Sequence, residues 1–261
     1  MTVISVLRFP LILLFSFLLL SGCVTETTSS FKSKASASKA ADSYVELALA
    51  YLRNHEYDLA LSRLEKALEI SPEHLEANSI LGLVYQEQGE AAHAEAQFRK
   101  AIDLDPGFTR GRTYLAAFLY NQGRLEESLA ESRRAAEDLK FSGRYQIFSN
   151  IGMIESQLGR PAEAIKAYEK SLVLRRDQPM NQLALSGLYL NSGNLTKAAR
   201  SYGLFWEAVR NGDARHTPAS LETGIQIARA AGDKDKEASL WLFLKNEFPE
   251  SAEYQRLSKG Q

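Results

Sequence analysis

The feature that most constrains the fold is a pattern of small and large apolar residues that recurs after 34 residues. The two copies correspond place for place: Leu47, Ala48, Tyr51, Ala60, Leu64, Ala67 and Pro72 in the first, and Leu81, Gly82, Tyr85, Ala94, Phe98, Ala101 and Pro106 in the second. A repeat at a fixed period of this length indicates stacked supersecondary units. Each unit needs its neighbours to bury its apolar face, so the chain is expected to form a repeat architecture with a continuous core.

This pattern resembles the tetratricopeptide repeat, a 34-residue helix–turn–helix unit. It continues with drift beyond the first two copies. The resemblance implies an all-α fold, a right-handed α-solenoid of about six helical hairpins. The expected solenoid spans residues 41–250, with repeats at about 41–74, 75–108, 109–144, 145–178, 179–212 and 213–250. Residues 251–261 are expected to be a C-terminal tail.

The spacing of small residues has a mechanical meaning. Glycine or alanine at Gly82, Gly152 and equivalent positions allows the two helices of a hairpin to approach closely, while aromatic residues such as Phe98 and Tyr168 pack between helices. Glycines also recur in the turn inside each hairpin, where a positive φ relieves the tight connection. These turn glycines are Gly89, Gly123, Gly159 and Gly193.

Residues 1–22 are expected to form an export signal. Arg8 and the N-terminal amine supply a short positive region, and the apolar run Phe9–Leu20 follows. This run is too short for a comfortable membrane span, which needs about 20 residues, but it suits a signal peptide. A transmembrane anchor is the alternative interpretation, and the absence of stop-transfer charges after the run disfavours it.

The tetrapeptide Leu20-Ser21-Gly22-Cys23 resembles the lipobox of bacterial lipoproteins, and Cys23 is the only cysteine in the chain. The resemblance implies cleavage before Cys23 and acylation of its thiol. Two or more acyl chains anchor a protein stably, whereas one does so only marginally. An Asp directly after the cysteine resembles an inner-membrane retention signal, and this chain has Val24 at that position. We therefore expect a lipid anchor in the outer membrane and a body in the periplasm. Residues 24–40 are rich in Ser, Thr, Ala and Lys and are expected to form a flexible tether.

The sequence offers no chemistry that would suit an enzyme. The four histidines, His55, His74, His93 and His216, lack a second ligand at metal-binding spacing, so surface histidines are favoured and no metal site is expected. The acidic residues Glu126, Glu127, Glu155 and Glu163 are expected on solvated helix faces. No nucleophile motif or phosphate-binding glycine loop occurs. We therefore expect a protein that is not an enzyme, without cofactor or small-molecule substrate.

The charge balance points away from nucleic acid. Loss of Arg8 with the signal leaves 30 basic against 32 acidic residues, a formal net charge near −2. Nucleic-acid binding would need a basic stripe, which the sequence lacks.

Partner binding is expected on the inner face, which the first helix of each tetratricopeptide hairpin lines. The predicted partner-binding residues are Val45, Leu49, Leu52 and Arg53 in the first repeat, Leu83 and Gln86 in the second, and Ala117 and Tyr120 in the third. The first helix is apolar on both faces, with Leu47 expected in the core and Val45 in the groove. We expect a segment of a partner protein to cover the apolar surface of this helix. The alternative is that the tether covers it, with Phe31 folded back, or that a second copy of the chain does.

The later repeats carry a closer resemblance. The stretches "FSNIGMIESQLGRPAEAIKAYEKSLVLRRDQP", "ARSYGLF" and "FPESAEYQ" resemble the type IV pilus biogenesis lipoproteins, the PilF/PilW pilotins. This resemblance implies a protein that binds subunits of the outer-membrane secretin and helps them to reach the outer membrane and multimerise. The sixth unit departs from the family in being longer. The alternative is a lipoprotein scaffold for another envelope machine, such as β-barrel assembly or cell-wall synthesis.

Overall fold

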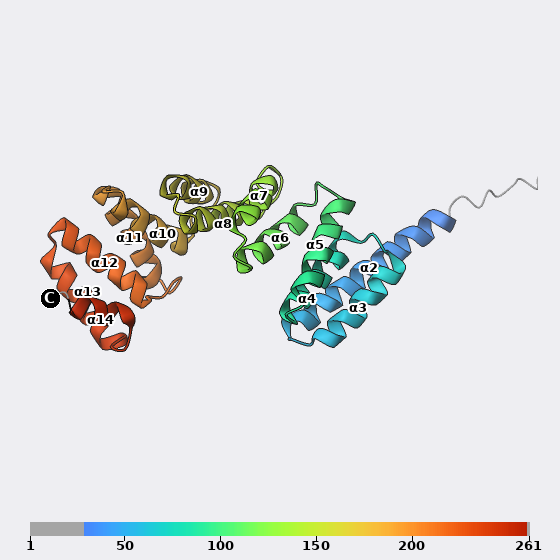
Figure 1. Cartoon of the computed structure of the whole chain (residues 1–261), viewed down its shortest axis with the longest axis horizontal. Helices are drawn as coiled ribbons and strands as arrows, with labels where there is room; N and C mark the ends of the chain where they lie inside the picture. Colours follow the sequence, from blue (N-terminus) through green and yellow to red (C-terminus); the bar gives the residue numbers. More distant parts are fainter. Residues whose placement is uncertain (1–28, 260–261) are drawn as a thin grey trace, which may run out of the picture. The chain divides into compact units, whose positions relative to one another are not determined.

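The structure, a computed structural model, describes residues 29–259 and within them contains helices as its only regular elements (Figure 1). The predicted all-α tetratricopeptide solenoid is confirmed. The predicted signal peptide, Cys23 and the first part of the tether lie outside the described residues. The chain divides into two compact units, Met1–Ile80 and Leu81–Gln261, which are described separately.

The first unit is built around one helical hairpin. Helix α2 (Ser29–Arg53) packs against α3 (Tyr57–Ile70), and α4 (Leu75–Glu87) begins at the end of the unit. Because α2 begins at Ser29, residues 29–40 are helical, and the prediction of a flexible tether is wrong for this stretch. Alanine and lysine are good helix formers. Extending an existing helix is much easier than nucleating one, so this segment continues the packed part of α2.

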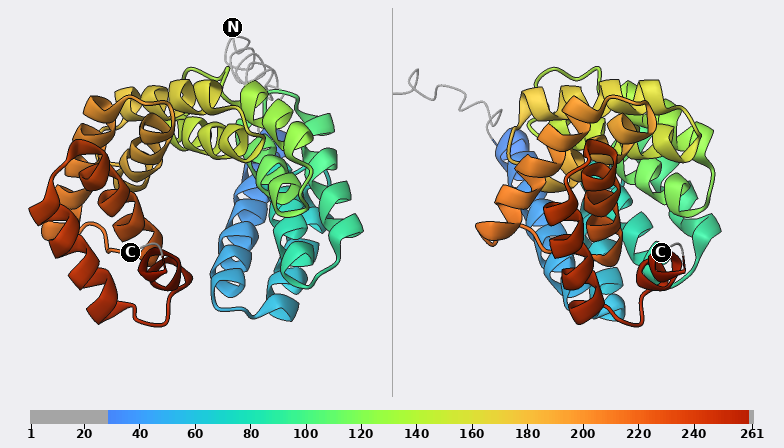
Figure 2. Two further views of the ribbon diagram at one scale, coloured as in Figure 1. Left: turned by 60° about the vertical axis from the view of Figure 1, so that its left-hand side comes forward. Right: turned by 90° about the vertical axis from the view of Figure 1, so that its left-hand side faces the viewer.

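The second unit contains the last part of α4 and the helices that follow it. Its helices after α4 are α5 (Ala91–Leu104), α6 (Thr109–Asn121), α7 (Leu125–Ala135), α8 (Arg144–Gln157), α9 (Pro161–Leu174), α10 (Pro179–Asn191), α11 (Leu195–Arg210), α12 (Pro218–Ala231), α13 (Lys234–Glu247) and α14 (Ala252–Ser258). Within this unit α6 packs on α7, α8 on α9, α10 on α11 and α12 on α13, and Figure 2 shows these pairs following one another.

The predicted turn glycines adopt the left-handed backbone conformation. Gly89, Gly123, Gly159 and Gly193 have φ angles of 79°, 73°, 71° and 76°. In the first hairpin the equivalent position is His55, which has a φ of 61°. A side chain in this conformation is strained relative to glycine, so the first turn carries a local cost that the later turns avoid.

Close approach of the helices explains the glycines inside them. A Cβ atom on Gly82 would lie 2.7 Å from the Phe98 ring, and one on Gly152 would lie 2.8 Å from the Tyr168 ring. Both aromatic side chains are buried. The predicted pairing of a small residue on the first helix with an aromatic residue on the second is confirmed at both places.

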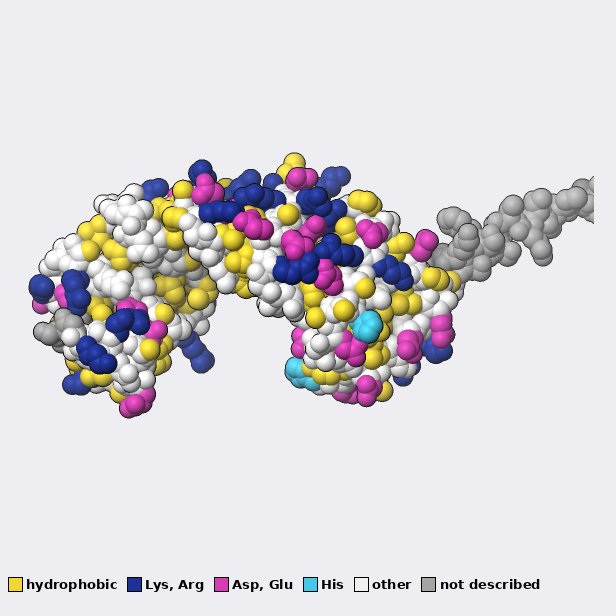
Figure 3. Space-filling model, viewed as in Figure 1, with side chains coloured by type: hydrophobic (Ala, Val, Ile, Leu, Met, Phe, Trp, Pro, Cys, Tyr) yellow, Lys and Arg dark blue, Asp and Glu magenta, His cyan; other side chains and the backbone are white. Residues whose placement is uncertain are grey.

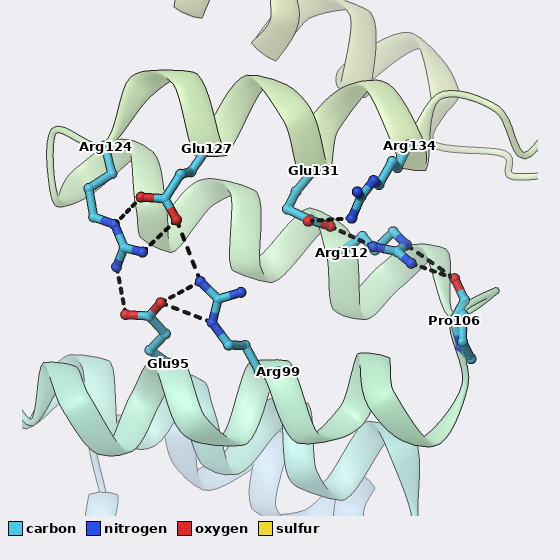
Figure 4. Close-up of polar contacts among 8 residues, drawn as sticks. All are labelled: Glu95, Arg99, Pro106, Arg112, Arg124, Glu127, Glu131 and Arg134. Carbon is cyan, nitrogen blue, oxygen red and sulfur yellow. Dashed lines mark hydrogen bonds and ion pairs between the residues drawn. The ribbon is translucent and has the colours of Figure 1, made fainter.

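Ion pairs join the second helices of neighbouring hairpins in the second unit. Between α5 and α7, Arg124 contacts both Glu95 and Glu127 at 2.6 Å, and Arg99 lies 3.6 Å from Glu127 (Figure 4). The Arg124 guanidinium holds the pKa of Glu95 below its usual range. We call this contact region, together with the pair between Arg112 of α6 and Glu131 of α7, the α5–α7 seam.

The C-terminal end is a helix where a tail was predicted. Helix α14 packs on α12, Tyr254 contacts Trp241 with ring centroids 5.6 Å apart, and Arg256 binds Glu222 at 2.6 Å. Leu257 is buried. Helix α14 therefore covers part of the last hairpin among the described residues.

Candidate functional site

The buried face of α2 differs from the predicted one. Ala41, Val45 and Ala48 are buried and lie four and three residues apart, so they share one side of the helix. Val45 was predicted to line an open groove, and this prediction is wrong because its side chain belongs to the core of the first unit. Leu47 was predicted to face the core, but its side chain is 40% exposed.

The repeat register explains why Leu47 is exposed. Its equivalents in the third, fourth and fifth repeats, Leu115, Ile151 and Leu185, are 1%, 7% and 2% exposed, and Leu81 in the second repeat is half-buried. In the third to fifth repeats this position is buried, whereas the first hairpin has no preceding hairpin among the described residues. The side of α2 that carries Leu47 is thus an unfilled stacking position. Tyr44 and Tyr51 lie on the same side and are half-buried.

Other apolar side chains of the first hairpin also reach solvent. Leu59 and Ile70 of α3 are 41% and 38% exposed. Of the predicted groove residues, Leu49 and Leu52 are half-buried and Arg53 is exposed. Figure 3 shows apolar side chains at the surface over α2 and α3, with acidic side chains next to them. We call the exposed apolar face of α2, comprising Tyr44, Leu47 and Tyr51, the α2 face.

In the second unit the predicted inner-face residues Ala117 and Tyr120 of α6 lie together. They line a cavity of about 190 Å³ that Asn150 and Met153 of α8 also line. A neighbouring cavity of about 320 Å³ shares Asn150. Met153 is 38% exposed and occupies the same repeat position as Ala117, so this inner surface is apolar and open along two adjacent repeats.

The predicted residues of α4 are less accessible. Leu83 is half-buried and packs against the core cluster that contains Phe98 and Phe118. Gln86 is also half-buried. Leu83 therefore contributes to the fold of its own hairpin, and its availability to a partner is smaller than that of Ala117.

Three predictions about polar residues are wrong, and one of them concerns His74, which was expected at the surface but has a side chain only 15% exposed. Glu155 was expected on a solvated face, but it is 1% exposed, and its carboxylate accepts a hydrogen bond of 2.5 Å from Arg133. His216 was expected at the surface, but it is half-buried with its ring centroid 4.6 Å from that of Trp206. Burial lowers the pKa of His216.

The described residues contain no group of three or more His, Cys, Asp or Glu side chains arranged to hold a metal ion. Among the helices of residues 29–259, none combines the length and apolar character that crossing a membrane requires.

Sequence reasoning missed a further cavity, which lies in the second unit. A cleft of about 540 Å³ lies between α9, α10 and α11, and none of its lining residues was predicted. A signal was present in the sequence. Aligning the third and fifth repeats shows that the charged residues Arg112 and Glu131 are replaced by Gln182 and Ser201, both of which line this cleft.

Comparisons with known proteins agree with the fold. Models of the tetratricopeptide repeat match residues 39–106 and 145–178. The chain is 34% identical over 237 residues to the type IV pilus assembly protein PilF of Pseudomonas aeruginosa. The aligned residues cover 90% of this chain and 92% of that protein.

Solved structures give the same picture. A structure of Pseudomonas aeruginosa PilF superposes with a TM-score of 0.80 at 33% identity, covering 87% of this chain and 100% of that one. PilW, described as a widely conserved type IV pilus biogenesis factor, superposes with a TM-score of 0.70 at 23% identity, covering 83% and 97%. YrrB, described as a tetratricopeptide protein with an unusual peptide-binding site, has a TM-score of 0.63 at 14% identity, covering 75% and 97%. The last two likenesses concern the fold alone.

Proposed function

Because the chain belongs to the PilF/PilW family of tetratricopeptide proteins of type IV pilus assembly, we propose that it acts as a pilotin for the secretin of the type IV pilus. In this role it binds secretin subunits and promotes their localisation to the outer membrane and their multimerisation. The role is one of binding and not of catalysis. Identity of 34% across nine-tenths of the chain supports the link to pilus assembly.

The anchor in this proposal is a lipid on Cys23. The lipobox-like sequence before this residue supports cleavage of residues 1–22 and acylation of the thiol. Two or more acyl chains hold a protein stably on a membrane. The mature chain would then sit on the outer membrane with its repeats in the periplasm, and a secretin subunit bound to it would travel by the same route.

The observation that carries the proposed binding role is the exposure of Leu47 at a position that the third to fifth repeats bury. Leu47 is 40% exposed, while Leu115 and Leu185 are almost completely buried. Complete burial of a leucine side chain stabilises by about 1.5–3 kcal/mol, so burying the exposed two-fifths of Leu47 would contribute roughly 1 kcal/mol. An apolar surface of this kind is typical of a site that another polypeptide covers.

The environment of the α2-face positions in other repeats indicates what kind of ligand would fit this face. In the third to fifth repeats the equivalents of Leu47 are buried among helices, so a helix with leucine-like residues three and four apart would fit the α2 face. We propose that an amphipathic helix of the secretin subunit packs on the α2 face. Leu49 and Leu52 are proposed as further contacts within the first unit, and Ala117 and Tyr120 on the inner surface of α6 as separate contacts within the second unit.

The test is co-purification from detergent-solubilised outer membranes of a strain that makes type IV pili. The lipidated wild-type chain is expected to bring down secretin, and Leu47→Glu is expected to reduce the recovered secretin at least tenfold, as for a central interface residue. Leu139→Glu is the matched control, because Leu139 is 75% exposed and lies away from the first hairpin in sequence. Both variants should keep the wild-type circular dichroism melt, since neither side chain is buried.

The outcomes separate the alternatives. Recovery of β-barrel assembly or cell-wall proteins in place of secretin would contradict the pilotin role and favour a scaffold. Unchanged secretin recovery with Leu47→Glu would contradict the α2 face as the binding surface. Cys23→Ala tests the anchor separately: we expect secretin to remain bound, but its multimers to be lost from the outer membrane.

A further inference from the structure

The cleft between α9, α10 and α11 lies on the side of the second unit formed by the second helices of its hairpins. Its base contains Leu185, Tyr189 and Ser201, which are buried, while Val173 of α9 and Leu204 of α11 form part of its sides. Its volume is about 540 Å³, within the range of roughly 300–1,000 Å³ that ligand sites occupy. We call it the α9–α11 cleft.

The repeat register shows why this cleft is open. In the α5–α7 seam, Arg112 and Glu131 form an ion pair at 2.6 Å, and both side chains are only 12% exposed (Figure 4). Seventy residues later, the same repeat positions are Gln182 and Ser201. The serine is much shorter than glutamate, and the pair is lost, so the space that the ion pair fills in one seam is empty in the other.

The sides of the cleft are apolar at positions where earlier repeats carry charged residues. Asp103 and Arg134 of the earlier repeats correspond to Val173 and Leu204. Val173 is 81% exposed and Leu204 is 43% exposed, although the fold tolerates charged residues at both positions. Exposed apolar side chains beside an open cleft favour a binding role over a structural one.

The charges around the cleft are predominantly positive. Arg176, Lys197 and Arg200 line it, against the single carboxylate of Glu169. Glu169 is already engaged, because Lys197 lies 3.4 Å from it and the Tyr189 hydroxyl donates a hydrogen bond to it. Among the described residues, Arg176 and Arg200 have no ion-pair partner, and both are exposed.

An adjoining opening of about 350 Å³ extends the cleft. It shares Arg176, Gln182 and Leu204 with the cleft and adds Asp177 and Asp213. The positive character is therefore greatest at the end near Arg200 and falls toward the adjoining opening. A ligand that combines apolar groups with a carboxylate fits this distribution in one orientation.

We propose that the α9–α11 cleft is a second docking site, and that it binds an acidic segment of a partner protein. One large apolar side chain of the segment lies between Val173 and Leu204 above Ser201, and a carboxylate beside it pairs with Arg200. The arrangement is that of an amphipathic peptide in a groove. The site does not depend on the α2 face, because all of its residues belong to the second unit.

The test uses a defined probe and the mature lipidated chain in nanodiscs of zwitterionic lipid. The probe is a fluorescein-labelled, amidated helical peptide with leucines at i, i+4 and i+7 and flanking glutamates; its partner probe has lysines in place of the glutamates. Fluorescence anisotropy is expected to show that the acidic probe binds at least tenfold more tightly than the basic one. Added salt should narrow this difference, because exposed charges are screened.

Two sets of variants localise the binding. Gln182→Arg combined with Ser201→Glu rebuilds the ion pair of the α5–α7 seam and is expected to weaken acidic-probe binding at least tenfold. Val173→Gln changes an exposed side chain that contributes nothing to the core, so it should fold normally and weaken binding several-fold. Arg200→Glu is expected to reverse the preference between the two probes. Leu139→Gln, an exposed apolar residue elsewhere, is the control and should bind as the wild type does.

Several results would overturn the proposal. These are equal binding of both probes, no binding at a probe concentration of about 1 mM, or unchanged binding in Val173→Gln and the rebuilt-pair variant. Binding of anionic vesicles that requires Arg176 and Arg200, without probe binding, would identify a lipid surface as the ligand instead. Because Leu47→Glu leaves this cleft intact, its acidic-probe binding should equal that of the wild type. A failure here is thus distinguishable from a failure of the α2 face.

Discussion

Replacing Gly152 by alanine tests the packing of the repeat through the sign of its effect. In an open helix, glycine to alanine stabilises by about 1 kcal/mol, because alanine has the higher helix propensity. Here the new Cβ would lie 2.8 Å from both Cγ and Cδ1 of Tyr168 and 2.9 Å from its Cδ2. These atoms form the base of the ring, which cannot swing away as the far end of a side chain can.

The expected result is therefore a loss of stability. Overpacking a well-filled core costs about 1–3 kcal/mol, and the gain in helix propensity offsets about 1 kcal/mol of this. Gly152→Ala should lower the free energy of unfolding by up to about 2 kcal/mol. Gly187→Ala is the matched control, because it is also helical and no neighbouring atom would lie within 4 Å of its Cβ. It should raise the free energy of unfolding by up to about 1 kcal/mol.

The assay is urea unfolding of the purified chain followed by far-ultraviolet circular dichroism. A second change extends it: Tyr168→Leu should suppress most of the cost of Gly152→Ala, because the first repeat pairs Ala48 with Leu64 at the same positions. A double-mutant cycle isolates this coupling. The reasoning is refuted if Gly152→Ala stabilises as much as Gly187→Ala, or if the two changes at 152 and 168 are additive.

Three further predictions concern polar residues. Arg133→Ala should lower the free energy of unfolding by about 2 kcal/mol. This is less than the 3–5 kcal/mol expected when a buried pair is fully broken, because Arg160 remains 3.6 Å from Glu155. Glu155→Met leaves no buried charge and should cost less than Arg133→Ala; a larger loss for Glu155→Met in urea unfolding would contradict this. Burial lowers the pKa of His216, so below its ordinary value near 6.5 the unfolded chain binds a proton that the folded chain resists. Stability should therefore fall as the pH decreases from about 7 to the lowered pKa, and thermal melts of His216→Phe should lack this component. His55→Gly should raise the free energy of unfolding by up to about 1 kcal/mol by relieving the positive φ; a lower melting temperature would show that the contact of His55 with Tyr57 outweighs the strain.

The periodic features of this fold could be predicted because each depends on local geometry. A helical hairpin of fixed length requires a left-handed residue in its turn, and Gly89 and Gly159 satisfy this requirement at the predicted places. The contact of Gly152 with Tyr168 follows in the same way from two residues at fixed separation. Such features need no knowledge of neighbouring repeats.

The errors occur where the periodicity ends. Leu47 has the sequence of a core residue, but its side chain is exposed, whereas Val45, predicted to line the groove, is buried. The helical extension of α2 to Ser29 was missed because a segment of Ser, Ala and Lys has no apolar side to mark it. Periodicity shows which positions repeat, but the environment at the first copy depends on what precedes it.

Pairwise contacts between repeats were also beyond the prediction. Glu155 is buried because Arg133 of the preceding hairpin reaches its carboxylate, and His216 is half-buried because Trp206 and Phe243 surround it. Neither arrangement follows from spacing within one repeat. The α9–α11 cleft, by contrast, could have been found by aligning the repeats and asking where a charged pair is replaced by smaller uncharged residues.

The most direct test of the proposed role is hydrogen–deuterium exchange of the full mature chain with and without a soluble secretin subunit. If a helix of the subunit covers the α2 face, the amides of α2 around Leu47 should exchange more slowly in the complex, because binding suppresses local opening of this helix. The amides of α13, which carries no proposed contact, should be unchanged. Slower exchange that is confined to other helices, or no change in α2 at a saturating subunit concentration, would contradict the account.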